Sequence, residues 1–208
     1  MTAEIGALRG EYVCLEPLEQ RHCDGLVSAA AADPCLYQWS PVPQGKAEAE
    51  RYIETALAWK AAGTAVPFAI VRKADNLVIG STRFWNIERW AWPAGHKLHN
   101  RETPDACEIG YTWFTGSAIR TAANTEAKFL MLSHAFESWR VFRVCFHTDS
   151  RNDRSRGALT RLGAKMEGIL RAHRMAADFT ARDSVRFSIL LAEWPAVKDR
   201  LLTFLNRH

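Results

Sequence analysis

The order of hydrophobic and polar residues predicts a chain in which strands and helices are mixed. Seven short stretches are rich in β-branched and aromatic residues and are bounded by turn residues, which is typical of strands. The predicted strands are Glu11–Glu16, Val66–Arg72, Leu77–Trp85, Cys107–Phe114, Phe142–Thr148, Ala164–His173 and Ala181–Leu191. The first reads as an edge strand, and the tight turn Ala74-Asp75-Asn76 joins the second and third into a hairpin.

Five longer segments carry apolar residues three and four positions apart, which is typical of helices that bury one face. The predicted helices are Gln20–Ala32, Ala47–Ala62, Asn124–Ser138, Asn152–Leu162 and Glu193–Asn206. Strand, helix, strand, helix and strand alternate in the middle of the chain. This order predicts a βαβ unit, in which a right-handed crossover joins parallel strands.

Residues 88–105 interrupt this regularity and are expected to form a long loop. They contain Trp90, Trp92, His96 and His99 together with prolines and a glycine, and they show no period. Long ordered loops in compact domains are often functional. An aromatic loop can equally serve as a flap that covers the edge of a sheet, and the sequence leaves both interpretations open.

Composition places the chain among ordinary globular proteins. Of its 208 residues, 48% are hydrophobic and 24% are charged, so we expect a single domain, 1–208, with its own core. Lys and Arg number 27 against 23 Asp and Glu, and the resulting net charge of +4 is spread along the chain. Because there is no basic run, nucleic-acid binding is not expected.

The five cysteines are scattered and form no CxxC pair, which speaks against a structural metal site and against a secreted disulfide framework. They are Cys14, Cys23, Cys35, Cys107 and Cys145. The first residues lack the pattern of a signal peptide, and no stretch approaches the roughly 18 apolar residues of a membrane helix. We therefore expect a soluble, cytoplasmic protein without a bound metal.

A segment of small and polar residues, Thr115–Glu126, connects the fourth predicted strand to the third predicted helix. Backbone N–H groups at a helix start lack partners within the helix, and the helix dipole adds partial positive charge there. With the guanidinium of Arg120 nearby, such a start suits a pyrophosphate group. The alternative is an ordinary helix cap, with Asn124 or Thr125 as the capping residue.

A second junction between a strand and a helix, Thr148–Ser155, follows. Asn152 has the side chain of an N-cap, which is its structural interpretation. The carboxyl ends of parallel strands meet at one edge of a sheet, where open α/β sheets bind ligands. One edge is therefore expected to present Arg120, Asn152, Arg154 and Ser155 together.

The ordered series EIGYTWF, IRTAANTEAKFLML, TDSRNDRSRGALTRLGA, MEGILRAH, RDSVRFSIL and EWP resembles the GNAT superfamily, and most closely its RimJ/RimL-type N-acetyltransferase branch. The resemblance extends from about Leu8 to Pro195. It implies a GNAT-like fold of mixed α/β class, with flanking helices and a mostly antiparallel sheet of about seven strands. One pair, Cys107–Phe114 and Phe142–Thr148, would be parallel and splayed.

The same resemblance implies an enzyme that moves an acetyl group from acetyl-CoA to a primary amine. The acceptor would be the α-amine of a protein N-terminus or a small-molecule amine. A CoA-binding protein of the same fold without catalysis is the alternative. The sequence does not decide whether the chain forms a homodimer.

The family's phosphate loop falls on residues 119–124, where Ile119, Ala122 and Asn124 depart from the family pattern. Because backbone N–H groups do most of the binding in this loop, the resemblance still implies a working loop, in which Ala122 should have a negative φ. The residues that the resemblance assigns to CoA binding are Trp113, Phe114, Ile119, Arg120, Thr121, Ala122, Ala123, Asn124, Thr125, Asn152, Arg154 and Ser155.

Two residues take catalytic roles by the same resemblance. Glu108 has the spacing of a general base known in some members, and Ser155 falls where a serine is proposed to lie near the thiol. A tyrosine acid found in other members is absent, because Leu159 occupies its position. The alternatives are a Glu108 that pairs with a neighbouring arginine and a Ser155 that only belongs to a helix cap. A backbone N–H of residues 111–113 is expected to stabilise the oxyanion.

Aromatic residues are expected to flank the acceptor side of the cleft, where they could hold a cationic amine by cation–π contact. The residues assigned to this role are Trp39, Trp85, Trp90 and Tyr111. Aromatics that cover the edge of the core are the alternative. Near the end of the sixth predicted strand, Arg171, His173 and Arg174 could instead recognise an acidic group of the acceptor.

Overall fold

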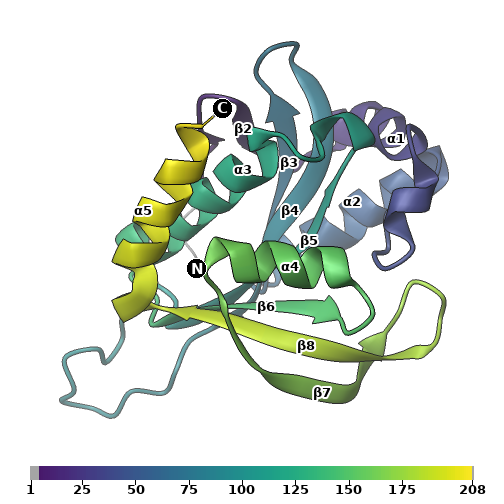
Figure 1. Cartoon of the computed structure of the whole chain (residues 1–208). Coiled ribbons are helices and arrows are strands. Elements are labelled where there is room, and N and C mark those ends of the chain that lie inside the picture. Colours follow the sequence, from purple (N-terminus) through teal and green to yellow (C-terminus); the bar gives the residue numbers. More distant parts are fainter. Residues whose placement is uncertain (1–4, 208) are drawn as a thin grey trace.

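The computed structural model describes residues 5–207 and is built around one eight-stranded sheet with the strand order β1-β2-β3-β4-β5-β6-β8-β7 (Figure 1). The strands are β1 (Leu8–Arg9), β2 (Val13–Pro17), β3 (Val66–Arg72), β4 (Leu77–Glu88), β5 (Ala106–Phe114), β6 (Arg143–Asp149), β7 (Lys165–Met175) and β8 (Ala181–Leu190). The helices are α1 (Cys23–Ala31), α2 (Lys46–Ala61), α3 (Ala122–Ser133), α4 (Asp153–Leu162) and α5 (Trp194–Leu205). This architecture confirms the mixed α/β class.

The sheet is mostly antiparallel, and its parallel pair is β5 and β6, as predicted. It has eight strands rather than about seven because the two-residue strand β1 pairs with β2. The prediction of an edge strand at the start of the chain was therefore wrong, since β2 lies between β1 and β3. The structure also differs at β7 from the predicted alternation of helices with parallel strands. This strand pairs with β8, which separates it from β6.

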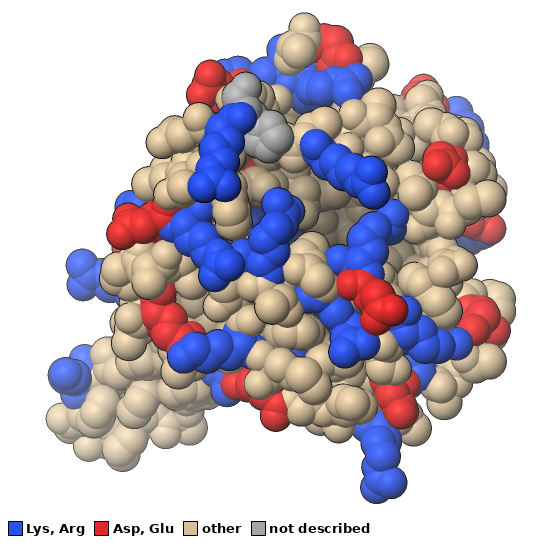
Figure 2. All heavy atoms as spheres, viewed as in Figure 1, with Lys and Arg blue, Asp and Glu red and all other residues tan. Residues whose placement is uncertain are grey.

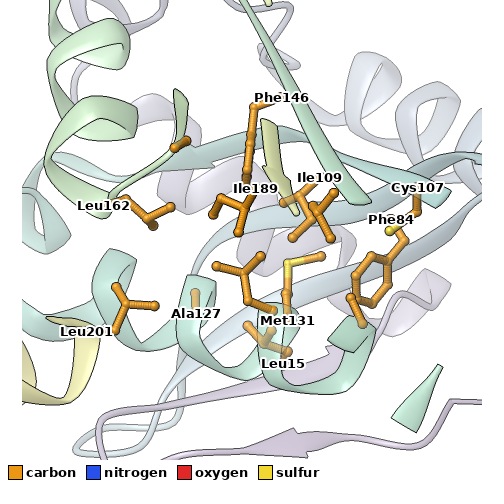
Figure 3. Close-up of a cluster of buried hydrophobic side chains, with 14 of the residues drawn as sticks. Leu15, Phe84, Cys107, Ile109, Ala127, Met131, Phe146, Leu162, Ile189 and Leu201 are labelled. Carbon is orange, nitrogen blue, oxygen red and sulfur yellow. The ribbon is translucent and has the colours of Figure 1, made fainter. Parts of the chain in front are cut away.

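The main core lies between one face of the sheet and the helices α3, α4 and α5. Figure 3 shows Leu15, Ile109 and Ile189 from the sheet beside Met131 from α3. These four side chains are at most 3% exposed. Alternation along the strands places apolar residues on this face, because successive side chains of a strand point to opposite sides.

A smaller core lies on the opposite face, where α1 and α2 cover β3 and β4. It includes Leu26 from α1, Ile53 from α2 and Trp113 from β5. In Figure 1 these two helices lie beside one half of the sheet, away from β7 and β8. The half of this face that β6 and β8 contribute is polar, and His147 of β6 lies there beside Glu108 of β5.

The loop 88–105 closes around a buried carboxylate. Asp105, which is 1% exposed, accepts hydrogen bonds from the backbone N–H of Trp90, from Nε1 of Trp92 and from Arg101. The ring of Trp90 stacks on Phe142, just before β6, with centroids 5.4 Å apart. The loop therefore covers the amino ends of β5 and β6, which supports the interpretation of this segment as a flap.

No helix among residues 5–207 is long and apolar enough to cross a membrane. Within the same residues, no three His, Cys, Asp or Glu side chains come together in a way that could hold a metal ion.

Candidate active site

A wedge opens between β5 and β6 in the middle of the sheet. The two strands pair only where Ala106–Glu108 faces Arg143–Cys145. Beyond this point β5 stays paired with β4, and β6 stays paired with β8. The backbone N–H and C=O groups of β5 that face β6 are therefore left without strand partners, and such groups require a partner from elsewhere.

A β-bulge lies within the wedge, at the height of Tyr111. Arg83 pairs with Gly110 and Ser81 pairs with Trp113, so one residue of β4 faces two residues of β5. Tyr111 has a φ of +51°, a left-handed conformation that is unusual for a large side chain. Bulges redirect side chains and often lie beside active sites. This one turns the side chains of Tyr111 and Trp113 to the face that α1 and α2 cover.

The phosphate loop leads from β5 into α3, and its start differs from the prediction. The N-cap is Thr121, whose Oγ1 accepts a hydrogen bond from the N–H of Ala123 at 3.2 Å. The expectation that Asn124 or Thr125 caps the helix was wrong, because both lie inside its first turns. The left-handed residue of the loop is Arg120, with a φ of +62°.

Ala122 is helical and does not have a positive φ, as expected for an alanine at this position. Ala122 and Ala123 are buried, and Ile119 is half-buried. The side chains of this loop are therefore mostly turned into the protein, which leaves its backbone N–H groups and the exposed Arg120 to face a ligand.

Asn152 caps α4 at the second junction and is 8% exposed. Its Oδ1 accepts a hydrogen bond from the N–H of Ser155 at 3.0 Å, as the structural interpretation predicted. The hydroxyl of Ser155 has no hydrogen-bond partner among the described residues and is half-buried. Arg154 donates to the carbonyl of Leu36, which ties the segment after α1 to the start of α4.

Positive charge gathers around the two helix starts. Figure 2 shows Lys and Arg side chains in excess over Asp and Glu on the face that carries α4, around a hollow in the surface. A small pocket between α3, α4 and α5 is lined by Asn124, Thr125, Ala158, Arg161, Leu162, Leu201 and Phe204. This pocket includes two of the residues assigned to the cofactor, Asn124 and Thr125.

Glu108 lies on β5 at the base of the wedge and is 2% exposed. Its two carboxylate oxygens accept hydrogen bonds from Arg174 at 3.1 and 2.9 Å. Nδ1 of His147, on β6, lies 3.1 Å from Oε2 of the same carboxylate. Burial raises the pKa of Glu108, but the contacts with His147 and Arg174 outweigh it, so this pKa is lowered overall. Pairing with an arginine, the alternative considered for this residue, is therefore present.

Two further titratable side chains extend this cluster towards β7 and β8. The ring of His173 lies 4.9 Å from that of His147, and burial together with the charge of Arg174 lowers the pKa of His173. Arg182 donates to the hydroxyl of Ser184 at 3.1 Å. Burial and the nearby Arg174 lower the pKa of Arg182. The cluster thus contains more cations than anions.

The aromatic residues expected at the acceptor side do not all come together. Trp85 lies 5.5 Å from Tyr111, ring centroid to ring centroid, and both are half-buried beside Glu108. Trp39 lies near the start of α4, where Arg151 covers its ring at 4.4 Å. Trp90 lies apart from these residues, in the flap at the amino ends of β5 and β6.

The position where aromatic faces could hold a cationic amine is taken by the chain itself. The guanidinium of Arg83 lies 4.8, 5.3 and 4.3 Å from the ring centroids of Tyr52, Trp59 and Tyr111. Sequence reasoning missed Arg83 because it reads as an ordinary polar residue of a strand. The sequence did contain a signal for this residue. Arg83 is two positions before Trp85 on β4, so the two side chains lie on the same face of the sheet.

Comparison with known proteins gives a consistent result. A family model described as the acetyltransferase (GNAT) domain matches residues 13–165. No curated protein matches the chain significantly. A GCN5-related N-acetyltransferase from Brucella melitensis is 28% identical with a TM-score of 0.81, and the match covers 99% of this chain and 87% of that chain.

Two other solved structures cover nearly the whole chain. One from T. thermophilus, assigned as an acetyltransferase, is 33% identical with a TM-score of 0.78, covering 99% of this chain and 100% of that chain. RimJ from Mycobacterium smegmatis in complex with CoA-disulfide is 22% identical with a TM-score of 0.75, covering 95% of this chain and 91% of that chain. At that lower identity the likeness concerns the fold.

Proposed function

Because the chain belongs to the GNAT acetyltransferase family, of the RimJ/RimL type, we propose that it moves an acetyl group from acetyl-CoA to a primary amine. The observation that carries this proposal is the wedge between β5 and β6, which opens towards two helix starts. The alternative is a protein of the same fold that binds acyl-CoA without transferring the acyl group.

The residues around the wedge fit a nucleotide thioester. The backbone N–H groups at the start of α3 and the charge of Arg120 suit a pyrophosphate. Beyond Glu108, the side of β5 that faces β6 has no strand partner, and its free N–H and C=O groups suit the amide groups of a pantetheine chain. The C=O of Phe114 already accepts from Tyr37, which leaves its N–H for this role. The ring of Trp113 is buried in the smaller core, and its backbone pairs with Ser81 of β4, so the role of Trp113 in this proposal is to hold the strand in place.

Transfer requires that the amine nitrogen attacks the thioester carbon while the C–S bond breaks and one proton leaves the nitrogen. Negative charge develops on the carbonyl oxygen, and a backbone N–H at the bulge of Tyr111 suits its stabilisation. Such a donor typically contributes about 3 kcal/mol.

The pKa of the amine decides how much base assistance is needed. An α-amine with a pKa near 8 costs about 1.4 kcal/mol to deprotonate at pH 7, whereas a lysine amine costs about 4.6 kcal/mol. We infer that an α-amine, of a protein N-terminus or a small molecule, is the acceptor. The thiolate of CoA is a good leaving group, so the hydroxyl of Ser155 needs only to donate a hydrogen bond.

The proton of the amine has two routes. Glu108 could accept it directly or through water, but both of its oxygens are already engaged by Arg174, and its pKa is lowered. Nδ1 of His147 lies 3.1 Å from the carboxylate of Glu108, and its Nε2 is buried and has no hydrogen-bond partner within the described residues. We propose that His147 accepts the proton and that Glu108 orients the ring, an arrangement in which each nitrogen has a defined role.

Calorimetric titration with acetyl-CoA and CoA tests the binding half of the proposal. We expect micromolar affinity that weakens in Arg120→Ala and Asn152→Ala and is unchanged in Arg51→Ala, an exposed control on α2. Release of CoA thiol in the presence of an amine then tests transfer. Binding without amine-dependent thiol release supports the non-catalytic alternative, and a folded protein that binds neither ligand contradicts both.

A further inference from the structure

Arg83, in the middle of β4, is a charged side chain that is buried without an acidic partner. It is 1% exposed and belongs to the largest fully buried side chains of the described chain. Its Nε and Nη2 atoms are buried and have no hydrogen-bond partner among the described residues. An unpaired buried charge is costly, and an apolar side chain could fill the same space at lower cost.

Three aromatic rings surround this guanidinium. They belong to Tyr52 and Trp59 of α2 and to Tyr111 at the bulge of β5, and their centroids lie 4.3–5.3 Å from its Cζ. Ring faces stabilise the cation, but they do not accept the hydrogen bonds that its N–H groups can donate. The rings are half-buried, so they form the wall that separates Arg83 from solvent.

Glu108, on the neighbouring strand β5, is engaged by another arginine. Its two carboxylate oxygens accept hydrogen bonds from Arg174 at 3.1 and 2.9 Å. It makes no ion pair with Arg83 in the described structure. The polar face of the sheet around the bulge thus carries an excess of positive charge, which favours an anionic reactant over a polycationic one.

We propose that Arg83 binds a carboxylate group of a reactant. The proposal rests on the proposed acetyltransferase function and specifies its substrate class. Arg83 pairs with Gly110, the residue before the bulge, and its guanidinium lies 4.3 Å from the ring centroid of Tyr111 at the bulge, where the proposed oxyanion donor also lies. Nε and Nη2 can donate two parallel hydrogen bonds to one carboxylate, the strongest geometry that a guanidinium offers.

The carboxylate can come from the acceptor, beside its amine, or from a dicarboxylic acyl group on the thioester. Both sources present the same group to Arg83, and the experiment separates them. Because Arg83 is 1% exposed, the proposal requires that one of the half-buried rings rotates to admit the carboxylate.

The first arm compares acceptors that differ in one carboxylate: alanine with alaninamide, phenylalanine with phenylalaninamide, and Ala-Asp-Phe amide with Ala-Asn-Phe amide. The second arm compares succinyl-CoA with acetyl-CoA on one amine. We expect kcat/KM to favour the carboxylate form at least about tenfold in one arm, and Arg83→Gln to abolish this preference. The arm that responds identifies the source.

Arg83→Lys keeps the charge but loses the paired donors, so it should retain only part of the preference. Arg51→Gln removes an exposed arginine of α2 and should leave the preference unchanged. Equal kcat/KM for both forms in both arms, or a preference that survives in a folded Arg83→Gln protein, overturns the proposal.

A binding measurement separates this proposal from the acetyltransferase function. CoA-saturated wild-type protein is titrated with succinate and with succinamide. Tighter binding of succinate that Arg83→Gln removes supports the carboxylate site even if no amine is acetylated. Equal binding of the two compounds overturns the site, while acetylation of amines by the same protein would leave the proposed function standing.

Discussion

Glu108 shows how the surroundings of one side chain change its role. On β5 its carboxylate is buried, accepts two hydrogen bonds from Arg174 and contacts His147. These contacts lower its pKa, so the carboxylate stays ionised and is held in one orientation. A carboxylate held in this way is better suited to fixing a histidine than to taking up protons itself.

Glu108→Gln should lower kcat about 100-fold, because the ring of His147 loses the carboxylate that orients it, while the affinity for acetyl-CoA stays within about threefold. Steady-state kinetics and calorimetry on the same preparation check this. The kcat of His147→Gln should be lower than that of the wild type by a similar factor. An unchanged kcat in both variants would exclude the cluster from proton transfer.

Lys128 is a buried lysine of α3 that lies outside the site. Its Nζ donates to Oγ1 of Thr112 at 2.6 Å, and burial lowers its pKa from 10.5 to about 7. Between these values the unfolded chain binds one proton more than the folded chain. The free energy of unfolding should therefore rise with pH in this range, by at most about 1.4 kcal/mol per unit from this group.

Urea denaturation of wild type and Lys128→Met between pH 7 and pH 9 measures this slope. We expect the stability advantage of the methionine variant to be largest at pH 7 and to shrink as the pH rises. The comparison cancels the contribution of the cysteines and tyrosines, which both proteins share. Parallel stability curves would contradict a shifted lysine.

At the scale of the elements, Glu126 connects α3 to the beginning of the sheet. Its carboxylate is 4% exposed and accepts hydrogen bonds from the backbone N–H groups of Glu11, Tyr12 and Val13 at 2.7–2.8 Å. Gly10 packs directly on this carboxylate, where a Cβ atom would collide with it. One side chain thus fixes the entry of β2 against the helix that carries the phosphate loop.

Glu126→Ala should lower the free energy of unfolding by about 3 kcal/mol, because three backbone donors lose their acceptor at once. Glu54→Ala, at an exposed position of α2, should change it by less than about 0.5 kcal/mol. Chemical denaturation measures both. Similar small losses in the two variants would mean that the backbone donors find other partners.

The elements also show where prediction from the sequence succeeds. Apolar spacing located all five helices within a few residues, and the strand–helix–strand order predicted the parallel pair. The bulge on β5 could not be predicted, because the segment around Tyr111 alternates without a break in the sequence. The bulge shifts this alternation by one residue, which brings Tyr111 to Arg83. Contacts of that kind depend on the partner strand, which local patterns do not contain.

For the whole molecule, the position of the flap separates stability from function. The loop 88–105 lies at the amino ends of β5 and β6, whereas the phosphate loop follows the carboxyl end of β5. Figure 1 shows the loop projecting from the lower edge of the molecule, away from the start of α3. Its role is therefore expected to be protection of the core.

Replacing residues 90–103 with a short Gly-Ser linker should leave the affinity for acetyl-CoA and kcat within about threefold of wild type. The melting temperature should fall by several degrees, since Asp105 and Phe142 lose their partners. Differential scanning calorimetry and kinetics check the two outcomes. A folded variant without activity would instead assign the loop to the active site.

The short contact between β5 and β6 has a mechanical consequence. Only three residue pairs join the two halves of the sheet at this line, whereas every residue of β6 pairs with β8. The two halves are therefore joined by few backbone hydrogen bonds, and the sheet bends most easily along the line between β5 and β6. A ligand that forms hydrogen bonds to both sides of the wedge bridges the two halves of the sheet. Binding of such a ligand should therefore reduce the motion of one half relative to the other.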